Sequence, residues 1–184
     1  MDRTQGASAL SYGEEAELVG ALTRQISLEK ELENAKMELA LKPDFNLMDG
    51  FRMFDLLARG WVVPSEFAGG LRDLGVLFDP QDVELFFKRF DKDNDNMLRY
   101  SDFCDAFTPL ATEHSKVLTV RTAYFIHKEI YKPNEYFHPE TRLALKNALR
   151  VHFLVEASSE DLRMKMSRRP AFNVYEAFKM CDYE

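Results

Sequence analysis

The chain has 184 residues and a mass of 21.4 kDa, which is enough for one domain of ordinary size or for two small ones. Its 24 Lys and Arg residues stand against 31 Asp and Glu residues, so the formal charge is −7 and the chain is a poor binder of nucleic acid or anionic lipid. With 46% hydrophobic and 30% charged residues, the composition excludes a disordered tail. We therefore expect a folded protein without nucleic-acid or membrane partners.

The cysteines and the N-terminal sequence indicate the compartment. Cys104 and Cys181 are far apart and lack metal-ligand spacing, which favours a reducing environment over a disulfide framework. The first residues contain no apolar signal region, and no apolar run approaches the roughly 18 residues needed to span a membrane. We expect a location in the cytosol or in a compartment reached from the cytosol.

Residues 12–42 predict one long amphipathic helix, preceded by a small, polar segment, 1–11, that we expect to be flexible. This stretch is rich in Glu, Leu, Ala and Lys and contains no proline. Pro43 ends it, because the residue before a proline is pushed out of the helical region. The apolar stripe of the predicted helix consists of Leu18, Leu22, Ile26, Leu28, Leu32, Ala35 and Leu39.

Residues 43–110 predict further short helices with aromatic faces. We expect Asp44 to cap a helix after Pro43, and Asp79 with Pro80 to start another. No segment of the first 110 residues alternates over the length of a strand, so the predicted fold class is all-α with a core rich in Phe and Met. The apolar positions expected to be buried are Leu47, Phe51, Phe54, Val83, Phe86, Phe87 and Phe90.

Residues 91–102 carry the strongest chemical signal, because they follow the pattern of an EF-hand loop, D-x-[DN]-x-[DN]-G-x5-E. Asp91, Asp93 and Asp95 fill positions 1, 3 and 5, where carboxylates converge on one hard cation. Met97 at position 7 would offer its backbone carbonyl, and Asp102 stands at position 12. The sequence therefore predicts one Ca²⁺ or Mg²⁺ site formed by these five residues.

Three positions of this loop depart from the pattern. Asn96 replaces the glycine of position 6, where the turn needs a positive φ that asparagine tolerates best among other residues. Arg99 places a cation beside the ion, and Asp102 is shorter than the usual bidentate glutamate. Fewer ligands favour six-coordinate Mg²⁺ or weak Ca²⁺ binding.

Residues 55–66 repeat the framework of this loop without its chemistry. Gly60 matches Asn96, and Val62 matches Leu98, so the two loops should pair through a short backbone bridge at this position. Positions 3 and 5 are Leu57 and Arg59, which remove two ligand oxygens. We expect no metal in this first loop.

A longer repeat aligns residues 21–55 with residues 148–182 without gaps, with eleven identical positions of 35. The repeated unit is a long helix, a proline and the entering helix of an EF-hand, so residues 139–184 read as the start of a second unit. Residues 111–138 are the expected linker. We expect the chain to be a fragment; the alternative is a lone final helix whose Val174, Phe178 and Cys181 would be exposed unless something covers them.

Three further stretches carry a family likeness: Lys42–Leu47, Tyr100–Cys104 with Phe107–Pro109, and Arg168–Phe178. Through these stretches, and over about residues 40–182, the sequence resembles the EF-hand proteins of cilia and flagella. This resemblance implies alternating EF-hand pairs and long helices, a place in the axoneme, and tubulin or other axonemal proteins as partners, including proteins of the doublet-microtubule lumen. The first loop and Asp102 depart from the metal positions of this family.

Two functions fit these patterns, and a third has no support in the sequence. One is a structural protein of the axoneme, and the alternative is a calmodulin-like calcium sensor that grips a target helix. We find no nucleophile with a base and no phosphate loop, so we expect no enzyme. The histidines read as ordinary surface or core residues, and the basic run 163–169 suits either an acidic partner or a solvated helix face.

Overall fold

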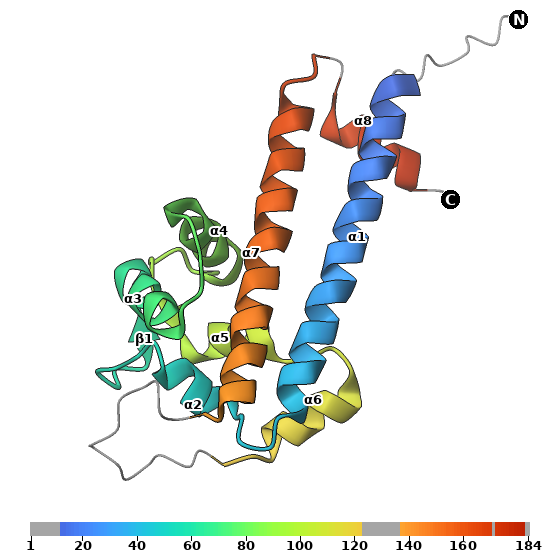
Figure 1. Ribbon diagram of the computed structural model, residues 1–184. Helices are drawn as coiled ribbons and strands as arrows, with labels where there is room; N and C mark the ends of the chain where they lie inside the picture. The colour runs from blue at the N-terminus through green and yellow to red at the C-terminus, as the bar shows by residue number, and fades with distance from the viewer. Residues whose placement is uncertain (1–11, 123–136, 171, 183–184) are drawn as a thin grey trace, which may run out of the picture. The chain divides into compact units, whose positions relative to one another are not determined.

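A computed structural model describes residues 12–122, 137–170 and 172–182 (Figure 1). The expected flexible segment 1–11 and most of the second half of the expected linker lie outside these ranges. The chain divides into two compact units. The core unit comprises residues 28–157, and the terminal unit comprises residues 1–27 and 158–184.

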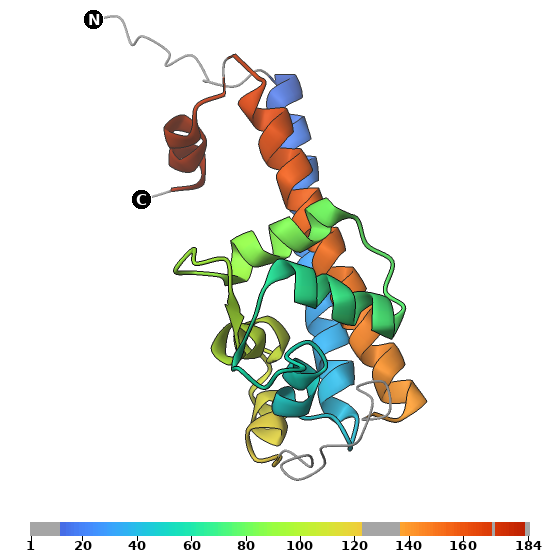
Figure 2. The ribbon, with the colours of Figure 1, turned by 90° about the vertical axis from the view of Figure 1, so that its left-hand side faces the viewer.

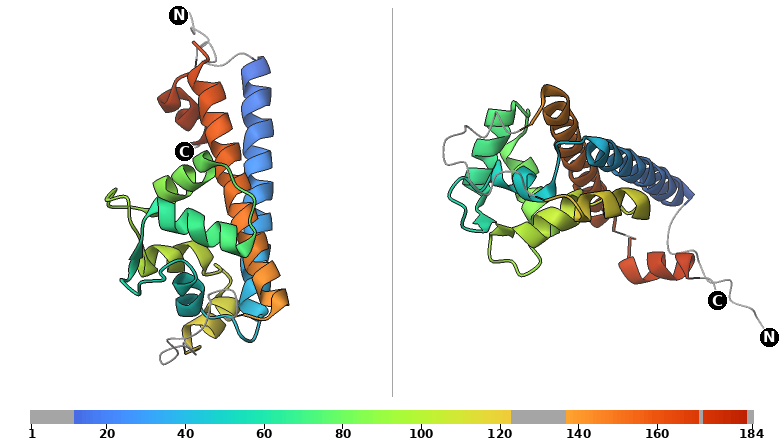
Figure 3. Two further views of the ribbon diagram at one scale, coloured as in Figure 1. Left: turned by 60° about the vertical axis from the view of Figure 1, so that its left-hand side comes forward. Right: turned by 90° about the horizontal axis from the view of Figure 1, so that it is seen from below.

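Over the described residues the protein is all-α, as predicted, apart from two strands of two residues each (Figures 1 and 3). The strands β1 and β2 pair antiparallel, with Trp61 opposite Arg99 and Val62 opposite Leu98. This confirms the predicted bridge between the two loops. The elements are α1 (Tyr12–Leu41), α2 (Leu47–Arg52), β1 (Trp61–Val62), α3 (Pro64–Leu74), α4 (Pro80–Phe90), β2 (Leu98–Arg99), α5 (Tyr100–Phe107), α6 (Thr112–Thr119), α7 (Pro139–Ser167) and α8 (Val174–Cys181).

The two units cut across the predicted domains 12–42, 43–110, 111–138 and 139–184. The C-terminal part of α1 and the N-terminal part of α7 belong to the core unit, because Leu32, Leu39, Leu145 and Leu149 are buried in one cluster with the aromatic residues of α2–α5. The segment expected as a linker contains α6. The apolar periodicity of the sequence predicts the helices, whereas burial in a common core decides which of them belong to the same compact unit.

The core is built from phenylalanine rings, as the composition indicated. Phe67 stacks on Phe54 with centroids 4.6 Å apart and on Phe86 with centroids 5.0 Å apart. Phe103 of α5 contacts Phe51 of α2 edge-on at 5.7 Å and Phe107 at 4.4 Å. Such offset and edge contacts are the geometries that ring quadrupoles prefer. They join the helices on both sides of the two loops into one cluster.

The prediction that Asp44 caps α2 is wrong. Asn46 is the N-cap, with φ −137°, and its side-chain oxygen accepts the N–H of Asp49 at 2.8 Å. Asp44 instead accepts the backbone N–H of His138 at 2.7 Å and the hydroxyl of Thr141, at the start of α7. This carboxylate therefore satisfies the N-terminus of a helix nearly 100 residues further along the chain, where a negative charge is also favoured by the helix dipole.

Helix α7 covers the aromatic face of α4 and α5 through His152. The imidazole lies edge-on to the rings of Phe86 and Phe90, each at 5.4 Å, and of Phe107 at 5.2 Å. Its Nε2 donates to the backbone carbonyl of Ala106 at 3.0 Å. His152 is thus a core residue with one satisfied polar atom, which agrees with the ordinary interpretation of the histidines.

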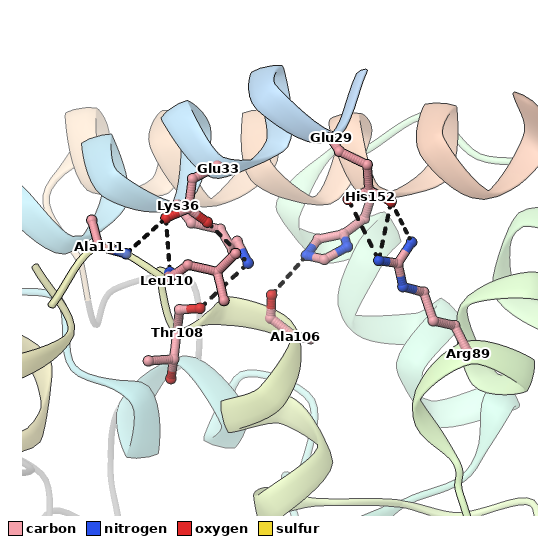
Figure 4. A network of polar contacts seen from close by, with 9 residues as sticks. All are labelled: Glu29, Glu33, Lys36, Arg89, Ala106, Thr108, Leu110, Ala111 and His152. Atoms are coloured by element: carbon pink, nitrogen blue, oxygen red, sulfur yellow. Dashed lines mark hydrogen bonds and ion pairs between the residues drawn. The ribbon is translucent and has the colours of Figure 1, made fainter. Parts of the chain in front are cut away.

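Ion pairs surround this contact. Arg89 of α4 pairs with Glu29 of α1 at 3.2 Å and with Glu156 of α7 (Figure 4 shows Arg89 and Glu29). Glu29 and Glu156 are equivalent positions in the repeat of residues 21–55 and 148–182. Each of the two long helices therefore contributes a glutamate from the same repeat position to the guanidinium of Arg89. Burial alone would lower the pKa of Arg89, but the hydrogen bonds and charges of Glu156 and Glu29 outweigh it and raise that pKa.

The C-terminal part of α1 is fixed to the segment after α5. Lys36 donates to the carbonyl of Thr108 at 3.3 Å, and Glu33 accepts the N–H groups of Leu110 and Ala111 at 2.7 and 3.1 Å (Figure 4). The first bond satisfies a carbonyl that the end of α5 leaves without a helical partner, and the other two satisfy N–H groups just before α6. Together, α1 and α7 lie beside the short helices within the core unit (Figures 1 and 2).

The terminal unit buries little apolar surface. The stripe predicted along α1 is buried at Leu32, Ala35 and Leu39, but Leu22 and Ile26 are 43% and 57% exposed. On α8, Val174 and Phe178 are also exposed. Arg169 pairs with Glu17 within this unit. No helix among the described residues is long and apolar enough to cross a membrane.

We predict that His152 makes the core unit sensitive to acid. Burial, followed by the charges of Lys36 and Arg89, lowers its pKa to about 3 from an ordinary 6.5. Between these values the unfolded chain binds one more proton than the folded chain, so the free energy of unfolding should fall with decreasing pH by up to about 1.4 kcal/mol per unit.

The matched test compares urea unfolding of the wild type, His152→Gln and His138→Gln between pH 7 and pH 4. Glutamine at position 152 keeps a donor for Ala106 but does not titrate, so the pH dependence of this variant should be flatter than that of the wild type. His138 is exposed, and its variant should follow the wild type. Parallel curves for all three proteins would contradict the assignment.

Candidate metal centre

The loop 91–102 begins where α4 ends and continues into α5 through β2. Asp91 is the C-cap of α4, and its N–H donates to the carbonyl of Phe87 at 2.7 Å. Its buried carboxylate accepts the N–H groups of Asn96 at 2.8 Å and Asp95 at 3.3 Å. The carboxylate of Asp91 at position 1 therefore holds the turn of the loop through two hydrogen bonds that need no ion.

The backbone of the loop has the shape that the sequence requires. Asn94 and Asn96 have φ of 55° and 63°, so the residue at position 6 adopts the positive φ expected there. In the first loop, Ala58 and Gly60 have φ of 51° and 84° at the same two positions. Asparagine tolerates this left-handed conformation because its side chain bonds locally, whereas alanine meets a steric penalty there. Both loops thus share one backbone path.

The structure brings Asp91, Asp93 and Asp95 together, with one carboxylate oxygen from each lying within 4.8 Å of the others. This separation is about twice the Ca²⁺–oxygen distance of about 2.3–2.6 Å, so one central ion can reach all three oxygens. Carboxylates are the hard ligands that Ca²⁺ and Mg²⁺ prefer. The three residues therefore fit a divalent cation.

The other two predicted ligands are placed differently. Asp102 is not part of the three-carboxylate group, and its Oδ2 accepts the N–H of Arg99 at 2.8 Å at the start of α5. The N–H of Met97 donates to Oδ1 of Asp95 at 2.9 Å. Asp102 and the Met97 carbonyl remain predicted ligands. The hydrogen bond from the backbone N–H of Arg99, the N-cap of α5, also shows that the short side chain of Asp102 caps the start of this helix.

Arg99 lies across the carboxylates. Its guanidinium donates to Asp93 at 2.9 Å and to Asp95. The hydrogen bond from Arg99 lowers the pKa of Asp95, whereas a hydrogen bond with Asp91 raises the pKa of Asp93. The sequence placed a cation near the ion, but only the structure shows that this cation binds two of the ligands.

The first loop has the same hydrogen bonds at position 1 as the second loop. Asp55 accepts the N–H groups of Arg59 at 3.0 Å and Gly60 at 2.7 Å, as Asp91 does for the equivalent residues. Leu57 at position 3 is exposed and offers no oxygen. Among the described residues, the group around Asp91 is the cluster of acidic, histidine or cysteine ligands close enough to share an ion. The absence of a metal in the first loop remains a prediction.

Residues 44–108 match the family model of the EF-hand domain pair. This segment is an EF-hand pair. The match covers both loops and the four helices that flank them, and it supports a calcium-binding EF-hand protein. Comparison with the curated proteins and with the solved structures finds no match to the chain.

Sequence reasoning missed the contacts that hold this EF-hand pair in place. Arg89, two residues before the loop, pairs with Glu29 and Glu156, which lie 60 and 67 residues away. The repeat contained one usable signal, since Glu29 and Glu156 are identical aligned positions. Nothing in the sequence identified Arg89 as their common partner.

We predict that Arg99→Gln strengthens ion binding. The variant removes a positive charge that pairs with Asp93 and Asp95 and that an incoming divalent ion would have to displace. Because the pairs are exposed, we expect a modest gain of about fivefold in the association constant for Ca²⁺. Isothermal titration calorimetry at low salt measures it.

The control for this experiment is Arg150→Gln, which removes an exposed arginine of α7 that pairs with Glu31 at 3.4 Å. Its Ca²⁺ affinity should equal that of the wild type. Equal affinities for all three proteins would show that Arg99 does not compete with the ion, and absence of binding by all three would contradict the metal site itself.

Proposed function

We propose that this chain is a non-enzymatic structural EF-hand protein of the ciliary or flagellar axoneme, with one weak Ca²⁺ or Mg²⁺ site. The site consists of Asp91, Asp93, Asp95, the carbonyl of Met97 and Asp102. The proposed location is the axonemal cytoskeleton, and the proposed partners are tubulin or other axonemal proteins. The axonemal part rests on the resemblance of residues 40–182.

The observation that carries the structural role is the covering of the EF-hand pair by α7. A calcium sensor works by opening an apolar face to a target helix. Here Phe86, Phe90 and Phe107 already surround His152 of the same chain. The face is occupied in cis, so an external target helix would have to displace α7.

The charges around this face favour the same conclusion. Arg89 joins α4 to both α1 and α7, two residues before the first ligand of the loop. Reorientation of α4 on ion binding would separate Arg89 from Glu156, which is buried, and would leave that carboxylate without its strong partner. Ion binding that tightens the loop while α4 stays docked avoids this penalty. The pair then serves as a fixed building block.

Hydrogen exchange tests whether α7 remains docked. We expect the amides of residues 139–157 to be equally protected in EDTA and in millimolar Ca²⁺, since the aromatic contacts persist in both states. The control is Asp93→Ala, which removes a ligand but leaves the turn bonds of Asp91 intact. Loss of protection in Ca²⁺ for the wild type alone would support the calmodulin-like sensor instead.

Co-sedimentation with stabilised microtubules tests the proposed partner. Binding to tubulin lattices should be saturable and should persist in EDTA, because a structural role does not require the ion. The chain of charge −7 meets an acidic polymer, so a specific interface rather than bulk attraction must provide the affinity. Failure to pellet with bare microtubules and with isolated doublet microtubules would contradict the axonemal proposal.

A further inference from the structure

The first loop of the pair, residues 55–66, has the backbone of an ion-binding loop but carries an arginine, Arg59, at one of the ligand positions. Its two positive φ values and the turn bonds of Asp55 reproduce those of the second loop. An ion-binding loop without its ion normally loses the electrostatic link between its middle and its last position. A replacement for that link must come from Leu57 or Arg59, which occupy positions 3 and 5, and leucine has no polar atom.

Arg59 forms this link. Its guanidinium donates to both carboxylate oxygens of Glu66, the residue at position 12 in the first turn of α3. The same guanidinium stacks over the ring of Trp61 in β1, with its central carbon 3.8 Å from the ring centroid. Glu66 also accepts the N–H of Val63 at 3.2 Å. One cation therefore ties position 5 to the strand and to the exit helix.

We propose that Arg59 is a built-in cation that takes the place of the metal ion in the first loop. It keeps loop 55–66 closed in the absence of any ion. Strand β1 is then always formed, and the bridge from Val62 to Leu98 gives the second loop a fixed partner. This inference does not depend on ion binding by the second loop or on the proposed axonemal role.

The chemistry explains why an arginine suits this position. A planar guanidinium can bond both oxygens of one carboxylate and stack on an indole at the same time. A lysine ammonium is a point charge that satisfies only part of this geometry. Glu66 and Arg59 are each about one third exposed, with side-chain exposures of 32% and 30%, so the contact is partly shielded from water.

A double-mutant cycle tests the link in EDTA. Arg59→Gln removes the charge, and Glu66→Gln removes the opposite charge but keeps an oxygen that can accept from Val63. Each single variant should lower Tm by about 2–4 °C. The Tm of the double variant should not fall below that of the less stable single variant, because the second change removes an interaction that is already lost. Arg150→Gln, with its exposed pair to Glu31, is the matched control and should leave Tm unchanged. Additive losses, or no loss, would overturn the proposal.

A gain-of-function variant tests the same inference independently. In a chain whose second loop is disabled by Asp93→Ala, the changes Leu57→Asp and Arg59→Asp should create an ion site with Asp55 and Glu66, since the backbone is already in place. Calorimetry should then detect one Ca²⁺ per chain where the Asp93→Ala parent binds none, and Ca²⁺ should raise Tm. A variant that still binds no ion would show that the first loop lacks the ion-binding backbone and would overturn the proposal.

Discussion

The contact of α7 with the aromatic face of α4 and α5 is the interaction on which the core unit depends. Three phenylalanine rings surround one imidazole, and the burial of each such ring stabilises the folded state by about 1.5–3 kcal/mol. The one polar bond of His152 goes to Ala106, and Arg89 closes the rim with Glu29 and Glu156. An EF-hand pair that is covered in this way has its apolar face satisfied by its own chain. This contact limits how far α4 can move when the loop 91–102 binds an ion, because α4 carries part of the covered face and ends at Asp91, the first predicted ligand.

The two loops show how one backbone path can be stabilised by different charges. In both, the carboxylate of position 1 accepts two backbone N–H groups and shapes the turn. In the second loop this leaves three carboxylates close together, and the guanidinium of Arg99 offsets part of their mutual repulsion. In the first loop the arginine at position 5 supplies a fixed cation instead. The strand bridge joins the loop that carries the three carboxylates to the loop that carries the arginine.

The sequence predicted local features well and distant contacts poorly. The positive φ of Asn96 followed from its position within one twelve-residue loop, and the bridge of Val62 with Leu98 followed from their equivalent positions in the two repeated loops. Asp44 was misread because a favourable capping residue beside a proline says nothing of a helix start that lies far along the chain. Leu22 and Ile26 belong to an apolar stripe, yet they remain exposed, because periodicity shows which face of a helix is apolar but not how much of that face is packed.

By itself, the sequence determined the all-α class, the paired loops and the grouping of Asp91, Asp93 and Asp95, because helix periodicity, capping and the spacing of acidic residues are encoded in neighbouring residues. The match of residues 44–108 to the EF-hand pair agrees with that determination. Only the tertiary structure decided that α7 covers the pair, that Asp44 serves α7, and that Arg89 joins two equivalent glutamates of the repeat. These contacts link residues 60 or more positions apart, and they form because buried apolar surface and charges must find partners in space; the pattern of one helix shows that it needs a partner but not which one.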